Sequence, residues 1–278
     1  MTALEFTLVV GILSAVAGFL GALTGLGGGV VVVPALTLAL GVDMKYAIGA
    51  SLVSVIATSS GAAAAYVREG FSNIRIGMFL EIATTSGAIA GAFLAGRVGT
   101  HALAIVFGLV LLQAAYQSFK GMGGRVEHVA SDKLATRLRM GSSYPVDGKP
   151  DRYGVRHVPG GFALMFGAGV LSGLLGIGSG AVKVIAMDRI MRIPFKVSTT
   201  TSNFMIGVTA AASAGLYFSH GYIDPRVAMP VMLGVLLGAL LGAKVLAHAR
   251  VKTLRIVFGV VILALAIEMI FSGITGRV

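Results

Sequence analysis

Gly-Leu-Gly-Gly-Gly at residues 25–29 is repeated as Gly-Ile-Gly-Ser-Gly at residues 176–180, which lies 151 positions further along the chain. Each run precedes a short apolar stretch. Paired glycine-interrupted apolar segments in two membrane halves indicate the central site of a transporter. The same offset, without a gap, matches Lys45 to Lys196, Ser51 to Ser202, Thr58 to Thr209, Tyr66 to Tyr217, Arg75 to Arg226, Gly87 to Gly238, Gly91 to Gly242 and Phe107 to Phe258.

The composition is that of a membrane protein. Of the 278 residues, 56% are hydrophobic and 12% are charged, whereas soluble domains carry about 25% charged residues. The net charge of +11 would suggest nucleic acid in a soluble protein, but here we expect basic loops that set membrane orientation, and no nucleic acid. The chain has no cysteine and its histidines lack metal-ligand spacing, so we expect neither a metal nor a cofactor.

Each half contains five apolar stretches, and the pattern predicts an all-α polytopic membrane protein. The third, fourth and fifth stretches are long enough to span a bilayer, which takes about 20 helical residues. The second stretch, residues 30–40 and 181–191, reaches only about half of the hydrocarbon core. We therefore expect two repeats, each a helical hairpin with a glycine tip and one short half-helix, followed by three transmembrane helices. Whether the first stretch of each half crosses fully stays open.

The two repeats are expected to have inverted topology. The hairpin returns the chain to the side from which it started, and three crossings follow, so each half crosses an odd number of times. With both termini outside, this topology places 16 Lys and Arg residues in inner loops and four in outer loops, as the positive-inside rule requires. We expect a first repeat at 1–119, a cytoplasmic basic linker at 120–157 and a second repeat at 158–278.

The linker has its own structural signals. Asp147-Gly148 is a strong tight-turn dipeptide, which favours a short hairpin. Residues 134–140 could form a small helix that contacts anionic lipid, and a solvated linker without structure is an equal alternative.

The glycine tips are the first candidate site. Glycine lets the backbone approach a ligand closely and adopt positive φ, and the short helix after each tip would present free N–H groups to an anion. The alternative is that the glycines only permit tight helix packing. We read the pairs Gly87/Gly91 and Gly238/Gly242 in that second way.

Lys183 is the most informative single residue, because it lies in an apolar run three positions after the second tip. A charge at such a depth usually faces a cavity or a partner, so we expect it to bind the anion and to take part in proton coupling. The alternatives are snorkelling to the interface or a salt bridge to Asp188. Glu81 and Glu268, which are expected to be buried, are candidates for a proton carrier or for the partner of Lys183 or Lys244.

A run of small polar residues, 198–203, opens a helix of the second half, and its first-half counterpart keeps only Ser51. Hydroxyl and amide groups can replace water around an oxyanion, although helix capping and interhelical hydrogen bonds would also use them. The complete predicted substrate site consists of Gly25, Gly27, Gly28, Gly29, Ser51, Gly176, Gly178, Ser179, Gly180, Lys183, Thr200, Thr201, Ser202 and Asn203.

The paired tips, GLTGLGGG before a short Val-rich helix that ends at Pro34, and SGLLGIGSG followed by PFKVSTTTSNFMIGVTA, resemble the sulfite exporter TauE/SafE family, over nearly the whole chain. This resemblance implies a secondary carrier in the inner membrane of a bacterium or an archaeon, for sulfite, for sulfonates such as sulfoacetate, or for related small organic anions. The long linker departs from a minimal family member. The expected partners are a small anionic substrate, a proton as coupling ion and the lipid bilayer; the oligomeric state stays open.

Two other classes of protein compete with the carrier. An intramembrane enzyme could use Ser179 as nucleophile, but Ile177 replaces the first glycine of the G-x-S-x-G motif, so we expect no catalytic residue. A membrane channel or scaffold without transport activity would need neither Lys183 nor duplicated tips. The predicted mechanism is alternating access around an anion held at the midplane.

Overall fold

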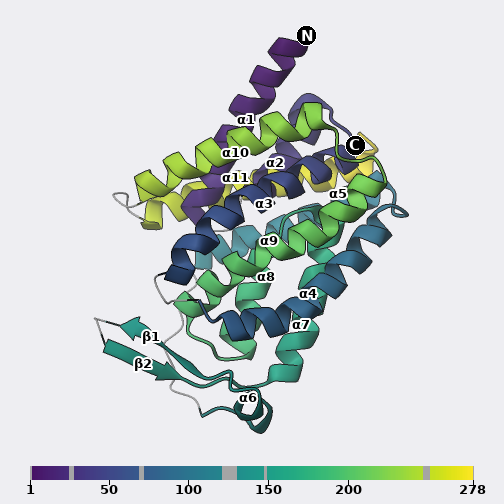
Figure 1. Cartoon of the computed structure of the whole chain (residues 1–278). Coiled ribbons are helices and arrows are strands. Elements are labelled where there is room, and N and C mark those ends of the chain that lie inside the picture. The colour runs from purple at the N-terminus through teal and green to yellow at the C-terminus, as the bar shows by residue number, and fades with distance from the viewer. Residues whose placement is uncertain are drawn as a thin grey trace.

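The computed structural model describes residues 2–24, 28–68, 72–120, 130–146, 149–246 and 251–277. The helices and strands in this part of the chain, with two π-helical turns labelled η, follow in order (Figure 1). They are α1 (Ala3–Thr24), α2 (Gly29–Pro34), η1 (Ala35–Ala39), α3 (Met44–Arg68), α4 (Ile74–Ala95), α5 (Thr100–Lys120), α6 (Lys133–Arg137), β1 (Ser142–Val146), β2 (Lys149–Tyr153), α7 (Val158–Leu175), α8 (Gly180–Ile185), η2 (Ala186–Ile190), α9 (Phe195–Ser219), α10 (Pro225–Leu246) and α11 (Val251–Thr275).

The sequence repeat is also a repeat of structure. The bounds of α2, η1, α3 and α4 recur 151 positions later as those of α8, η2, α9 and α10. The backbone follows the same rule outside the helices, because Gly41 (φ 63°) and its counterpart Arg192 (φ 58°) both adopt the left-handed conformation after the π-helical turn. The short apolar helix at Gly29–Ala39 confirms the predicted half-length segment.

Six of the described helices, α1, α4, α5, α7, α10 and α11, are long and apolar enough to cross a membrane. The first stretch of each half is therefore long enough to span. Large apolar side chains such as Phe218, Leu237 and Leu241 are exposed on the long helices, as expected where the surrounding solvent is lipid. These features confirm the all-α polytopic membrane fold. Helices α3 and α9 have 25 residues each but carry more polar side chains, and they pack against each other.

The first helix of each half packs against the third long helix of the other half, α1 on α10 and α7 on α4. In both pairs the contacts advance together along the two chains. Gly169 lies against Thr84 and Gly173 against Ala88, just as Gly234 lies against Gly11 and Gly238 against Ala15. Both pairs of helices therefore run parallel.

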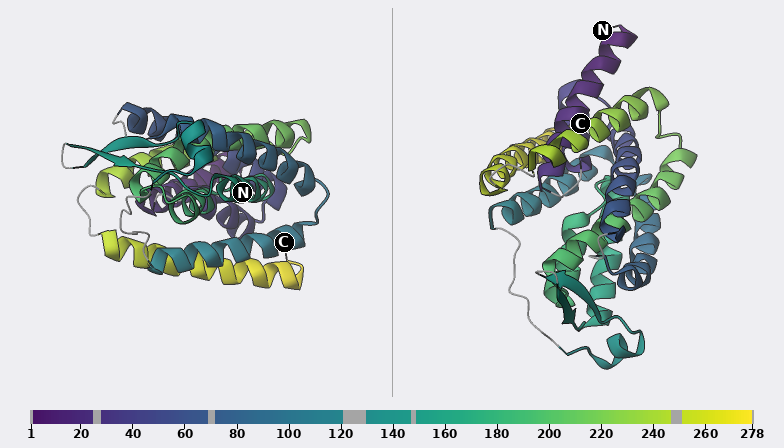
Figure 2. Two further views of the ribbon diagram at one scale, coloured as in Figure 1. Left: turned by 90° about the horizontal axis from the view of Figure 1, so that it is seen from below. Right: turned by 60° about the vertical axis from the view of Figure 1, so that its left-hand side comes forward.

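Equivalent helices, in contrast, run antiparallel. In the α5–α11 pair, Gly108 lies against Ala266 and Gly273 against His101, so the two helices run in opposite directions. Figure 2 shows these helices side by side along one edge of the molecule. A helix that is antiparallel to its own repeat counterpart means that the second repeat is inverted, as the sequence predicts.

The described part of the region between the halves, residues 130–146 and 149–157, is folded. Asp132 caps α6 by accepting a hydrogen bond from the backbone N–H of Ala135 (2.7 Å), and β1 pairs with β2 in antiparallel register from Ser142–Tyr153 onwards. The predicted hairpin and small helix are thus confirmed, while the turn residues Asp147 and Gly148 lie outside the described residues. The division into 1–119, 120–157 and 158–278 as domains stays a prediction.

Asn73 attaches this linker to the helices. Its side chain caps α4 through the backbone N–H of Ile76 (3.1 Å) and donates to the carbonyl of Met140 (3.1 Å) and the hydroxyl of Tyr153 (2.8 Å). Tyr153 is buried, and this burial raises the pKa of its phenol. The linker therefore packs on the end of α4 rather than lying free in solvent.

The glycines of α4 provide the first test of the packing. A Cβ at Gly91 would collide with the backbone of Val170 on α7, whereas one at Gly167 would meet nothing within 4 Å. We expect Gly91→Val to destabilise the protein by about 1–3 kcal/mol or more through overpacking, and Gly167→Val to leave it nearly unchanged. Thermal unfolding in detergent measures both, and equal melting temperatures for the two variants would contradict the proposed role of Gly91.

Candidate functional site

The second glycine tip has a backbone that side chains rarely tolerate. Gly176 (φ 67°), Gly178 (φ 68°) and Ser179 (φ 46°) are all left-handed, and only glycine adopts this conformation without steric cost. The tip is held from the other half by the hydroxyl of Ser51, which donates to the carbonyl of Gly176 (2.9 Å). Ser179 is the one residue of these three that carries a side chain in a strained position.

The first tip differs in conformation. Gly25 and Gly27 lie outside the described residues. Gly28, the counterpart of Ser179, has right-handed backbone angles (φ −65°), and a Cβ on it would press into Val235 of α10. Gly29 approaches the hydroxyl of Ser51 and the carbonyl of Gly176 so closely that a Cβ would lie 2.6 and 3.2 Å from them. The start of α2 therefore contacts the second tip, as predicted for two facing hairpins.

The hydroxyl run of α9 mostly bonds to the protein itself. Thr201 accepts from the backbone N–H of Asn73 (3.0 Å), Ser202 donates to the carbonyl of Gly180 (3.3 Å), and Thr200 donates to the carbonyl of Lys196 (3.0 Å). Asn203 is half-buried. Ser202 thus supports the tip directly, whereas Thr200 and Thr201 serve helix geometry and linker attachment in this conformation.

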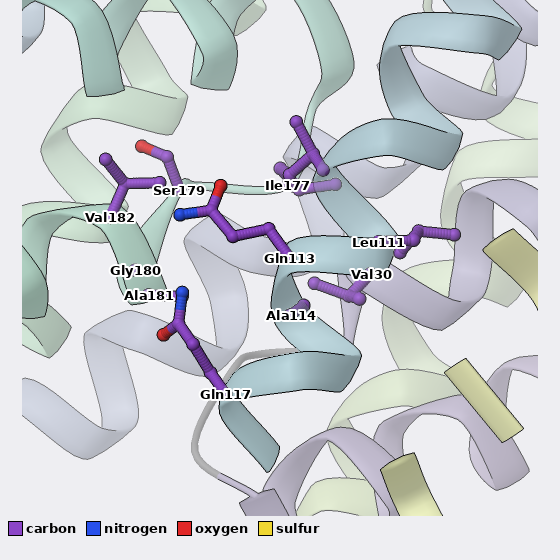
Figure 3. A pocket seen from close by; sticks show the side chains of 11 residues that line it. Val30, Leu111, Gln113, Ala114, Gln117, Ile177, Ser179, Gly180, Ala181 and Val182 are labelled. Carbon is purple, nitrogen blue, oxygen red and sulfur yellow. The ribbon is translucent and has the colours of Figure 1, made fainter. Parts of the chain in front are cut away.

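A pocket lies between the second tip, the start of α2 and α5 (Figure 3), with about 380 Å³ of empty space including its open mouth. Gln113 and Gln117 reach from α5 toward the second tip. Gln117 is 9% exposed and Ser179 is 4% exposed, yet Oε1 of the first and Oγ of the second have no hydrogen-bond partner. The lining residues are Val30, Val110, Leu111, Gln113, Ala114, Gln117, Ile177, Ser179, Gly180, Ala181 and Val182.

Gln113 and Gln117 escaped the sequence analysis, which took its candidates from the duplicated elements. A signal was present, since two amides one helical turn apart interrupt an otherwise apolar helix, and their repeat counterparts are Ala264 and Glu268. Buried polar atoms are normally hydrogen-bonded. A hydroxyl and an amide oxygen that both lack a partner in one pocket are therefore suited to bind a small polar ligand.

Lys183 does not line this pocket. Its side chain is fully buried, and Nζ donates to the hydroxyl of Thr209 on α9 (2.6 Å). Thr209 in turn donates to Oε1 of Glu81 on α4 (2.7 Å), which also accepts from Thr85 (3.0 Å). We call these four residues, Lys183, Thr209, Glu81 and Thr85, the lysine cluster.

The cluster selects among the alternatives that the sequence leaves open for Lys183. The ammonium of Lys183 contacts Thr209 and, through Thr209, Glu81, rather than Asp188 or the membrane interface. Glu268 was expected to be buried, and this expectation is wrong, because its side chain is exposed on α11. The side chain of Lys244 lies outside the described part of the structure. Glu81 is therefore the carboxylate that compensates the charge of Lys183.

The pocket contains the amide groups of Gln113 and Gln117 and the hydroxyl of Ser179. A buried cation, Lys183, lies on α8, the short helix that begins directly after Ser179. Such groups bind anions through donated hydrogen bonds and charge. Among the described residues, no group of three His, Asp or Glu side chains is placed to hold a metal ion. These amide and hydroxyl groups are suited to donate hydrogen bonds to a small anion.

Comparison with known proteins agrees with this architecture. The sequence model of the "Sulfite exporter TauE/SafE" family matches residues 10–269. The chain is 26% identical over 278 residues to "Probable membrane transporter protein YunE" of Bacillus subtilis (strain 168), an alignment that covers 98% of this chain and 99% of that protein. It is also 26% identical over 259 residues to a "Probable membrane transporter protein" of Xylella fastidiosa (strain 9a5c), covering 92% of each. No solved structure matches.

The lysine cluster gives a prediction on stability. Lys183→Met leaves the carboxylate of Glu81 buried without its cation, and breaking a buried charge pair in this way costs about 3–5 kcal/mol. Adding Glu81→Gln removes the unpaired charge, so we expect the double variant to unfold at a higher temperature than Lys183→Met alone. Thermal unfolding of the four proteins of this cycle measures the coupling, and strictly additive effects would contradict the pairing.

Proposed function

Because this chain belongs to the sulfite exporter TauE/SafE family and is a multi-pass membrane transporter, we propose that its cargo is a small anion, most simply sulfite or an organosulfonate such as sulfoacetate. The observation that supports this cargo is the pocket beside the second tip, where the hydroxyl of Ser179 has no partner and the amides of Gln113 and Gln117 lie near the half-helix that bears Lys183. The family and its relatives are transporters and not enzymes, so Ser179 is a binding residue rather than a nucleophile in this proposal.

The chemistry of the pocket suits an oxyanion. The hydroxyl of Ser179 and the amide N–H groups of Gln113 and Gln117 are hydrogen-bond donors, and an oxyanion presents several acceptor oxygens. Lys183 directly follows Val182 of the lining and supplies positive charge from behind the tip without contact. The predicted roles of Gly176, Gly178 and Gly180 are to let this backbone approach the ligand closely.

The inverted repeat supports alternating access as the mechanism. In carriers built this way, one repeat or bundle moves against the other around a site near the midplane. Here α3 and α9 run antiparallel and contact each other next to both tips. In the proposal the anion binds between the tips, and movement of the repeats exposes it to one side and then to the other. The direction of net transport follows the gradients of the anion and of its coupling ion.

We further propose that the linker lies in the cytoplasm of a bacterial or archaeal cell and that both termini lie outside. The side chain of Arg75 on α4 donates to the carbonyl of Arg139 (2.8 Å), and the backbone N–H of Arg156 donates to the carbonyl of Met191 (3.0 Å). These two bonds hold the basic linker and the second hairpin at one end of the molecule. At the other end, Lys45 donates to the carbonyl of Gly96 (3.4 Å), among few basic residues. The positive-inside rule assigns the first end to the cytoplasm.

Uptake of radiolabelled sulfite into proteoliposomes tests the cargo, with unlabelled sulfoacetate and other sulfonates as competitors. We expect saturable uptake that Gln117→Leu and Ser179→Ala each reduce about tenfold or more, since each loses a donated bond to a charged ligand, worth about 1.5–3 kcal/mol. Lys183→Ala should abolish uptake, while Lys133→Ala, which removes an exposed linker lysine, should not change it. Uptake that does not saturate would indicate a channel, and no uptake of any oxyanion by folded protein would refute the proposed cargo.

The absence of cysteine makes the topology directly testable. Ser143 on β1 and Ser219 at the end of α9 are both exposed, and each can be replaced singly by cysteine. We expect a membrane-impermeant maleimide to label Ser219→Cys in intact cells and to label Ser143→Cys only after permeabilisation. The reverse pattern would invert the proposed orientation.

A further inference from the structure

The lysine cluster is present in only one of two equivalent places. The repeat puts Val32, Thr58 and Met232 at the positions that correspond to Lys183, Thr209 and Glu81. The threonine is kept, whereas the cation and the carboxylate are both replaced by apolar residues. The two charges therefore occur as a pair, as expected if neither can be buried alone.

Glu81 has one oxygen that the fold does not use. The side chain is 7% exposed, and Oε1 accepts from Thr209 and Thr85, but Oε2 is buried and has no hydrogen-bond partner. An ionised carboxylate accepts hydrogen bonds at both oxygens, and a bare charged oxygen in an apolar setting is unfavourable. Oε2 is thus the atom of the lysine cluster where a bound proton would neutralise a buried oxygen that has no hydrogen-bond partner.

The charges that face Glu81 are few. The described helices packed most extensively on α4 are α7 and α9. Helix α7 has no titratable side chain, α9 has Lys196 in its first turn and Tyr217 near its end, and α4 itself has Arg75 in its first turn. These three groups lie at helix ends, so Lys183 of α8 is the charge that balances Glu81.

We propose that Glu81 is the proton-binding residue of the carrier and that one proton moves together with each singly charged anion. This inference rests on the proposed anion transport. In the empty site the ammonium of Lys183 and the carboxylate of Glu81 sum to zero. When a proton binds Oε2, Glu81 becomes neutral and Lys183 is left uncompensated, so the half-helix attracts an anion into the adjoining pocket, and the sum is again zero.

Electroneutrality is the physical reason for the coupling. A net charge inside the membrane is costly, so the empty and the fully loaded sites can move through it, whereas a site with only the proton or only the anion carries an unbalanced charge. Thr209 links the two sides of the exchange, because its hydroxyl contacts both Nζ of Lys183 and Oε1 of Glu81. Its counterpart Thr58 donates to the carbonyl of Ser54 (3.0 Å) and has no charges beside it in the repeat pattern.

The experiment separates exchange from accumulation in proteoliposomes with radiolabelled sulfite, under a potential clamped at zero. Counterflow is the exchange of labelled for unlabelled sulfite at equal pH on both sides, and it needs no net proton movement. It therefore measures transport by the carrier without proton coupling. Accumulation is then measured with the external pH fixed and the interior made more alkaline. Sulfite itself binds a proton, so the readout is the ratio of wild type to Glu81→Gln under identical gradients, which cancels sulfite speciation.

We expect Glu81→Gln to retain counterflow and to lose proton-driven accumulation, so that wild type accumulates about tenfold more sulfite per unit of pH difference, as one coupled proton requires. Thr209→Val should weaken the response to internal pH, whereas the matched Thr58→Val and the exposed Glu268→Gln should leave it unchanged.

Equal accumulation by wild type and Glu81→Gln, with counterflow intact in both, would overturn the proposal. Absence of counterflow in the wild-type protein would instead refute the proposed sulfite transport on which it rests. If Glu81→Gln loses counterflow as well, Glu81→Asp decides: a carboxyl that restores both activities supports the proton site, and one that restores counterflow without the pH response overturns it.

Discussion

Close contact between helix backbones at glycine is the constraint on which the rest of this structure depends. Where Gly87 and Gly91 of α4 meet α7, and Gly234 and Gly238 of α10 meet α1, a single Cβ would collide with the facing backbone. In a membrane, where lipid is as apolar as the side chains, association relies on such packing and on interhelical hydrogen bonds. Because the first helix of each half contacts the other half, these contacts join the repeats and place the two tips against each other.

The tips and the lysine cluster follow from that interlocked arrangement. Ser51 from the first half bonds the second tip, and Glu81 from the first half balances Lys183 from the second. The binding pocket and the charge pair are therefore both shared between the repeats. A relative movement of the repeats would change both together, which is the geometric requirement for coupling an anion to a proton.

The two repeats depart from symmetry mainly in the side chains around the second tip. The backbone repeat is nearly complete, down to the left-handed pair Gly41 and Arg192, but the second tip alone has the strained Ser179, the adjoining Lys183 and the facing Gln113 and Gln117. A symmetric site would offer a ligand two equivalent positions, with no preference for either tip. Among the described residues, the polar and charged groups gather around the second tip, whereas Gly28 and Val30 of the first hairpin are buried.

The sequence by itself determined the membrane class, the 151-residue repeat, its inversion, the half-length helices and the placement of Lys183 in an apolar segment, because these follow from local hydropathy, glycine spacing and loop charge. It also predicted the hairpin of the linker from Asp147-Gly148. Only the tertiary structure decided that Glu81 rather than Asp188 or Glu268 balances Lys183, that Thr200 and Thr201 already bond to the protein, and that Gln113 and Gln117 line the pocket. The reason is physical: these facts depend on which faces of helices distant in sequence meet, and a helix's own sequence does not record the rotation and depth at which its neighbours pack.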